Sequence, residues 1–259
     1  MIWLSISITL ILVIVLASKK KKKEKAKLAV PADLKDLLQQ NVRFYQLLDD
    51  NGKERFYARA VHFLEQVHIE GVGIEIENLD RALVAASAII PIFGFDDWKY
   101  FNLTNVIIYP ASFDEKYQFE GDDKRILGMV GSGNMNGQMI LSQSALRQGF
   151  SAYADKQNTA IHEFVHLLDK SDGVVDGVPN NLLEHSYSLP WLNLIRQEIT
   201  KIEKGRSDIN PYGAMNTGEF LAVVSEYFFE KPAELEKKHP QLYDMLAHMF
   251  KQDLAKQQA

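Results

Sequence analysis

The five residues His162-Glu163-Phe164-Val165-His166 constrain this chain most, because they place two histidines and a glutamate within an amphipathic helical pattern. Histidines four residues apart lie on one helix face, where both imidazoles can bind a single zinc ion. The glutamate beside them can take a proton from a water that the metal activates. The pattern predicts His162 and His166 as zinc ligands and Glu163 as general base. The alternative is two surface histidines on an amphipathic helix.

A catalytic zinc site also needs a third protein ligand. The chain has no cysteine, so this ligand must be a histidine or a carboxylate. Glu184 follows His166 by 18 residues, at about the spacing of a thermolysin-like site. Glu219 and Glu226 lie seven residues apart on a later helical segment, which places them two turns apart on one face. The residue pattern leaves all three glutamates open.

The N-terminus combines an apolar run with a block of positive charge. Residues 2–18 are uncharged, and seven lysines follow within residues 19–27. A helix of this length spans about 25 Å, slightly less than the roughly 30 Å hydrocarbon core, and lysine side chains can extend to the interface. A cleavable signal peptide would instead carry its positive charge before the apolar run.

Cytoplasmic flanks of membrane helices carry an excess of lysine, which sets the expected orientation of this segment. We expect a transmembrane anchor at residues 1–18 and a basic juxtamembrane linker at 19–30. The chain would then be a single-pass protein of the inner (cytoplasmic) membrane, with its catalytic domain on the cytoplasmic side. This domain is expected to span residues 31–255.

The formal net charge of −5 hides an asymmetry between the anchor and the domain. Residues 1–27 carry seven lysines and one glutamate, so the other residues hold 22 basic and 33 acidic groups, a net charge of −11. Such an acidic domain argues against a nucleic-acid partner. Anionic lipid would also repel it, so membrane association would depend on the anchor.

The periodicity of apolar residues predicts an α+β domain with a small sheet followed by a mainly helical half. The glycine-rich residues 128–137 favour a hairpin. Residues 139–142 are either an edge strand along which a peptide substrate pairs or an interior strand. Strands are expected at 72–77, 105–109 and 139–141. Helices are expected at about 31–48, 53–68, 80–91, 158–170, 190–203, 217–229 and 233–250.

Four segments resemble those of a known family: Val106–Phe113 (VIIYPASF), His162–Asp169 (HEFVHLLD), Asp176–Pro179 (DGVP) and Gly218–Pro232 (GEFLAVVSEYFFEKP). Over about residues 55–250 the chain resembles the Mlc titration factor A family of zinc peptidases. The resemblance implies a zincin-like metallopeptidase domain of the gluzincin type, distantly similar to the anthrax lethal factor catalytic domain. It also implies a zinc cofactor and aminopeptidase action on short peptides. The family members considered lack the apolar segment and the lysine run.

The resemblance also implies roles for individual residues. Glu219 matches the family's third metal ligand. Tyr212 matches a tyrosine whose phenol can donate a hydrogen bond to the oxyanion of the tetrahedral intermediate, although a turn residue is the alternative. We expect Glu226 to orient a ligand imidazole. Asp169 is a candidate for a similar role or for a salt bridge.

Two hypotheses for the function follow. The first is a zinc-dependent peptidase that acts on a peptide or protein substrate, with aminopeptidase action favoured and endopeptidase action open. The alternative is a membrane-tethered regulatory protein that keeps the zinc site for its structure and sequesters a transcription factor. Glu163 favours the enzyme, because a purely structural zinc site needs no general base. The sequence identifies no surface for a regulatory protein partner.

Overall fold

The computed structural model describes residues 30–114, 126–131, 135–151 and 155–257. The expected anchor (1–18) and nearly all of the expected linker (19–30) lie outside these residues, so both stay predictions. Within the described ranges, no helix combines the length and the apolar character that a membrane crossing requires.

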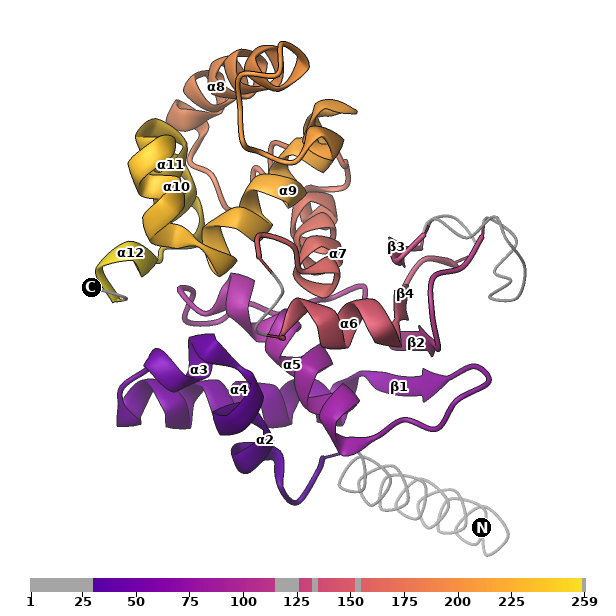
Figure 1. Cartoon of the computed structure of the whole chain (residues 1–259). Helices are drawn as coiled ribbons and strands as arrows, with labels where there is room; N and C mark the ends of the chain where they lie inside the picture. The colour runs from indigo at the N-terminus through magenta and orange to yellow at the C-terminus, as the bar shows by residue number, and fades with distance from the viewer. Residues whose placement is uncertain (1–29, 115–125, 132–134, 152–154, 258–259) are drawn as a thin grey trace, which may run out of the picture.

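A small mixed sheet lies beside the helices, and all its strands come from the first 142 residues of the chain (Figure 1). Three strands run parallel, and the fourth runs antiparallel to its neighbour. In sheet order the strands are β1 (His68–Gly71), β2 (Asn105–Tyr109), β4 (Gln138–Ser142) and β3 (Gly128–Val130).

The hairpin predicted from the glycine-rich residues is present as β3 and β4, with Met129 opposite Ile140. β4 lies between β2 and β3, so residues 139–142 form an interior strand and the edge-strand alternative is wrong. Within the described residues, β3 forms the edge of the sheet on this side.

The helices of the first half surround α5, which is buried on nearly all sides. Its alanine-rich sequence allows close approach, and it packs against α2, α4 and α7. A helix that is apolar all round is expected in the interior of a protein. These first helices are α2 (Leu34–Asn41), α3 (Arg43–Leu47), α4 (Asp50–Gln66) and α5 (Asn78–Ile92).

The second half of the described chain is helical, which agrees with the predicted α+β organisation. α7 packs between α5 and α9, near the middle of the molecule (Figure 1). The elements are α6 (Gln143–Gly149), α7 (Thr159–Asp169), η2 (Lys170–Asp172), α8 (His185–Glu203), η3 (Pro211–Ala214), α9 (Thr217–Glu230), α10 (Pro232–Lys238), α11 (Pro240–Phe250) and α12 (Leu254–Gln257).

The strand expected at 72–77 is wrong, because β1 precedes it and residues 72–77 are irregular. The chain turns back over Gly71, where an added Cβ would clash with the carbonyl oxygen of Ile74. Ile74 and Ile76 still pack against the core, which explains the alternation of apolar residues. Here the alternation reflects a loop that covers the core.

Two of the expected helices are each divided in two. The first breaks at Val42, whose backbone is extended (φ −115°, ψ 98°) and whose side chain is fully buried. The helix expected at 233–250 breaks before Pro240, because proline lacks an N–H donor and disfavours a helical conformation at the preceding His239.

Two further helices differ most from the expectation. α6 was not predicted; it follows β4 directly, and Ser142 Oγ accepts a hydrogen bond from the backbone N–H of Ala145 (3.3 Å) at its start. α8 begins at His185 rather than at Pro190, so the proline lies inside the helix. A short helix, or the first turn of a longer one, contains too few residues to show a helical period of apolar residues.

Candidate metal site

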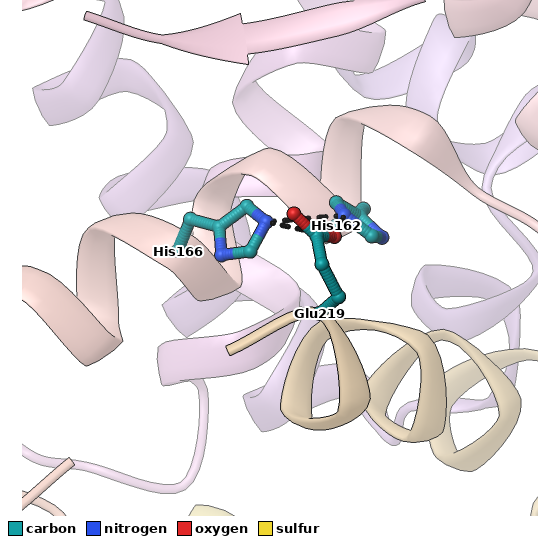
Figure 2. A group of neighbouring side chains, drawn as sticks. All are labelled: His162, His166 and Glu219. Atoms are coloured by element: carbon teal, nitrogen blue, oxygen red, sulfur yellow. Dashed lines mark hydrogen bonds and ion pairs between the residues drawn. The ribbon is translucent and has the colours of Figure 1, made fainter. Parts of the chain in front are cut away.

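The phase of α7 is fixed by its apolar face. Asn158 caps the helix through its side-chain oxygen, which accepts a backbone N–H of the first turn. Phe164 is fully buried, and its ring lies 5.8 Å from the ring of Phe63. With this face packed inward, His162 and His166 project together from an adjoining face toward α9 (Figure 2).

The start of α9 brings Glu219 to the two histidines. The side-chain oxygen of Asn216 accepts a hydrogen bond from the backbone N–H of Glu219 (2.9 Å), which fixes the first turn of the helix. Most of α9 is buried, and it packs closely on α7. Glu219 reaches from this first turn toward both imidazoles (Figure 2).

Three atoms from these residues converge on one point, as a metal site requires. His162 Nε2 lies 3.0 Å from Glu219 Oε2 and 3.1 Å from His166 Nε2, and His166 Nε2 lies 3.4 Å from Glu219 Oε2. Ligands at about 2.05 Å from a tetrahedral zinc would be about 3.3 Å apart. The three donors are therefore already spaced as ligands of one small divalent cation, and they form a group that could hold a metal ion.

Glu226 contacts the imidazole of His162 on the side away from the cluster. Its Oε1 lies 2.7 Å from His162 Nδ1, so this nitrogen donates to the carboxylate and Nε2 faces the cluster. Burial alone lowers the pKa of His162, but the hydrogen bonds with Glu219 and Glu226 outweigh it and raise that pKa to about 10. The predicted role of Glu226 in orienting a ligand imidazole requires such a contact, and the role itself stays a prediction.

The two histidines favour the charged form of Glu219. Burial raises the pKa of Glu219, but hydrogen bonds with His162 and His166 outweigh burial and lower that pKa to about 2. Glu219 is therefore held as a carboxylate beside the two imidazoles. Protons compete with a metal for such donors, so the affinity for metal should depend on pH.

Glu163 is held beside the cluster, and only 6% of it is exposed. Burial raises the pKa of its carboxyl group above the usual value, although both neighbouring histidines oppose the shift. β3 passes directly over this side chain, and a Cβ added to Gly128 would lie 2.7 Å from Glu163 Oε1. A side chain at this position would therefore displace the Glu163 carboxylate.

Tyr212 lies at the open side of the cluster. Its ring centroid is 6.0 Å from that of His162, and 47% of the residue is exposed. Burial and the carboxylates of Glu219 and Glu163 raise the pKa of its phenol, which keeps the hydroxyl protonated. Tyr212 belongs to the short helix η3, so it is part of a turn and also a neighbour of the cluster.

Asp169 is buried near His166 but makes no hydrogen bond to it. Its Oδ2 accepts the backbone N–H of Gly177 (2.8 Å), while its Oδ1 and His166 Nδ1 both lack a hydrogen-bond partner within the described residues. Burial raises the pKa of Asp169 to about 6. The structure thus shows neither the orienting contact nor the salt bridge considered for this residue.

Glu184 lies away from the three donors. It is exposed just before α8 and lines a cavity together with Trp98 and His248, and neither histidine of the cluster lines this cavity. Of the three glutamates left open by the residue pattern, only Glu219 joins the two histidines in the cluster. The assignment of metal ligands, general base and oxyanion donor stays a prediction.

Two residues at the site were missed by the sequence analysis. The backbone N–H of Asn158 donates to Glu226 Oε2 (2.6 Å), so the residue that caps α7 also fixes the partner of His162. Gly128 was noted only as part of a hairpin. An asparagine just before the helical pattern signals a cap, but neither its link to Glu226 nor the approach of Gly128 is visible in the sequence.

Comparison with known proteins adds independent information. The model of a family described as glucose-regulated metallo-peptidase M90 matches residues 16–251. An uncharacterized protein of Synechocystis sp. is 29% identical over 234 residues, which cover 85% of this chain and 84% of the relative. Mlc titration factor A of Klebsiella pneumoniae is 27% identical over 219 residues (80% and 81%), and that of Salmonella arizonae is 29% identical over 215 residues (77% and 83%).

Proposed function

We propose that this chain, which belongs to the glucose-regulated metallo-peptidase M90 family, hydrolyses peptide bonds with a zinc ion held by His162, His166 and Glu219. The observation that carries the proposal is the spacing of the three donor atoms, between 3.0 and 3.4 Å. Two imidazoles and one carboxylate are a donor set typical of catalytic zinc.

The metal would supply Lewis-acid chemistry, lowering the pKa of a water and polarising the scissile carbonyl. Glu163 takes one proton from this water, whose oxygen forms a bond to the carbonyl carbon. The same proton then passes to the leaving amine nitrogen as the carbon–nitrogen bond breaks. The buried position of Glu163 and its raised pKa suit a group that first accepts and then donates a proton.

Tyr212 is proposed to donate its phenolic hydrogen to the oxyanion that develops during this attack. Its exposed position beside His162 leaves the hydroxyl free to reach a bound substrate. A preorganised donor of this kind acts mainly in the transition state.

Replacing Tyr212 by phenylalanine should lower kcat by about 10²-fold with little change in KM, because only the oxyanion contact is lost. Steady-state kinetics of the zinc-loaded protein measures both constants. Tyr187→Phe is the matched control, since Tyr187 is also a partly exposed tyrosine but packs on His248. If both variants retain the kcat of the parent protein, Tyr212 is a turn residue only.

Within the described residues, Gly128 and Val130 of β3 have no strand partner on the side away from β4, and this edge is proposed as the strand along which the substrate backbone pairs. In the antiparallel hairpin, Leu127 accepts from Ser142 (2.8 Å) and Gly131 donates to Gln138 (2.9 Å). Because backbone groups alternate along a strand, those of Val130 point away from β4. An extended peptide could add there as a further strand, next to Glu163.

Val130→Pro should raise KM about tenfold with a smaller effect on kcat, because it removes one backbone N–H from the free edge of β3. Val130→Ala keeps this N–H and serves as the control for the lost side chain. Equal KM values for the two variants would show that substrate does not pair with this edge.

Aminopeptidase action on short peptides is proposed from the family resemblance. The zinc-loaded protein should release the first residue of a short peptide, whereas the same peptide with an acetylated N-terminus should resist cleavage. Chelation should abolish the activity, and about one equivalent of zinc should restore it. Zinc binding without turnover of any peptide in a broad panel would instead favour the regulatory alternative.

A further inference from the structure

A cavity of about 540 Å³ lies apart from the metal cluster, between the helices α2 and α3 and the C-terminal end of α9. Glu230 lies on its wall, eleven residues after Glu219 on α9, which corresponds to about 16 Å along the helix. Its volume falls within the range of small-molecule sites in proteins. The apolar part of its wall includes Val42, Ile90, Ile161, Phe229 and Leu254.

One carboxyl group on the wall of this cavity has no role in the proposed reaction. Glu230 Oε1 accepts a hydrogen bond from Asn158 Nδ2 (2.9 Å), and Glu230 makes no ion pair within the described residues. Burial raises the pKa of Glu230 to about 7, against the opposing effects of Asn158 and Lys231. Charging a carboxyl group that is shielded from water and has no partner costs free energy. A cationic ligand therefore stabilises the charged form of such a group most strongly.

Two cations lie at the same cavity without a fixed partner. Arg43 and Lys231 both line it and are exposed, and neither side chain forms an ion pair or hydrogen bond with another described residue. The cavity therefore combines the half-buried Glu230, the exposed carboxylate of Asp155, an apolar wall and two exposed basic groups. These features complement the ammonium, the side chain and the carboxylate of one small zwitterion.

We propose that this cavity binds a free α-amino acid with an apolar side chain, its ammonium group on Glu230 and its carboxylate on Arg43 or Lys231, and that occupancy is coupled to the metal cluster. A chain of hydrogen bonds provides the coupling. Asn158 donates from Nδ2 to Glu230 (2.9 Å) and from its backbone N–H to Glu226 (2.6 Å). Glu226 in turn accepts from His162 Nδ1 (2.7 Å).

The binding test uses calorimetric titration of metal-free protein, because an amino acid is also a peptidase product and can bind a metal. L-Leucine should bind with a Kd between about 10 µM and 1 mM, as expected for so small a ligand. Leucinamide lacks the carboxylate and 4-methylpentanoate lacks the ammonium, so each should bind at least fivefold more weakly. Absence of leucine binding, or equal affinity for all three compounds, would overturn the proposal.

Two variants test the assigned contacts. Glu230→Gln keeps an acceptor for Asn158 but removes the charge, and it should weaken leucine binding at least tenfold. Arg43→Gln changes an exposed side chain and should weaken binding about threefold or more. Glu203→Gln, an exposed position on α8 outside the cavity, is the control and should bind leucine normally. Normal binding by Glu230→Gln would place the leucine elsewhere.

The coupling has its own readout, which requires no hydrolysis. An ammonium on Glu230 keeps that carboxylate charged, which strengthens its hydrogen bond with Asn158 and holds Glu226 against His162. Saturating leucine should therefore tighten zinc binding about threefold to tenfold, and Glu230→Gln should remove the effect. Zinc affinity that is independent of leucine would refute the coupling. Because these tests follow binding only, their failure is distinguishable from a failure of the peptidase proposal.

Discussion

Replacing Glu163 by glutamine is expected to lower kcat/KM by about 10³-fold or more while zinc binding is retained. Glutamine has nearly the same shape, so it fits beneath Gly128, but its amide cannot take a proton from water. The loss corresponds to about 4 kcal/mol of transition-state stabilisation, within the range for general acid–base catalysis.

The measurement pairs peptide hydrolysis with the zinc content of the same preparation. Glu184→Gln provides a matched control, because it makes the same chemical change at an exposed position away from the cluster. It should retain both zinc and activity. A Glu163→Gln variant that cleaves peptides at the normal rate would refute the proposed role of the carboxylate.

Replacing Glu219 by alanine is expected to weaken zinc binding about 10³-fold or more, because two histidines alone leave the site without its third ligand. Glu219 also carries the negative charge that is paired with both imidazoles, at 3.0 and 3.4 Å. Its removal should therefore also lower the pKa of His162, since one of the two hydrogen-bonded carboxylates is lost.

Competition with a zinc indicator measures this affinity for the variant and for two comparisons. Glu184→Ala should bind zinc as the parent protein does. Glu226→Ala should lose about 10-fold to 100-fold, as expected for a residue that orients a ligand without binding the metal. Loss of zinc in Glu184→Ala with normal binding in Glu219→Ala would move the site to a thermolysin-like arrangement.

Helical periodicity predicted the parts of the site that depend on a single element. The phase of α7 places His162 and His166 on one face, because the apolar Phe164 must face the core. The start of α9 was predicted at residue 217, where the helix begins, and Asn216 caps it. Such local patterns are robust because each follows from the geometry of one helix.

The contacts between elements could not be derived from the same patterns. The spacing of residues along the chain does not show that Glu219 lies at the two histidines. It also does not show that Glu184 lines a cavity elsewhere in the molecule. The approach of Gly128 to Glu163 depends on how β3 is placed over α7. The extended residue Val42 and the short strand β1 were missed because they interrupt or shorten a periodic pattern.

The most direct test of the account is the position of zinc in crystals of the loaded protein, located by anomalous scattering at the zinc edge. The account predicts one strong peak about 2.0–2.2 Å from Nε2 of His162, Nε2 of His166 and a carboxylate oxygen of Glu219. A peak at Glu184 in place of Glu219, or zinc bound away from both histidines, would contradict it.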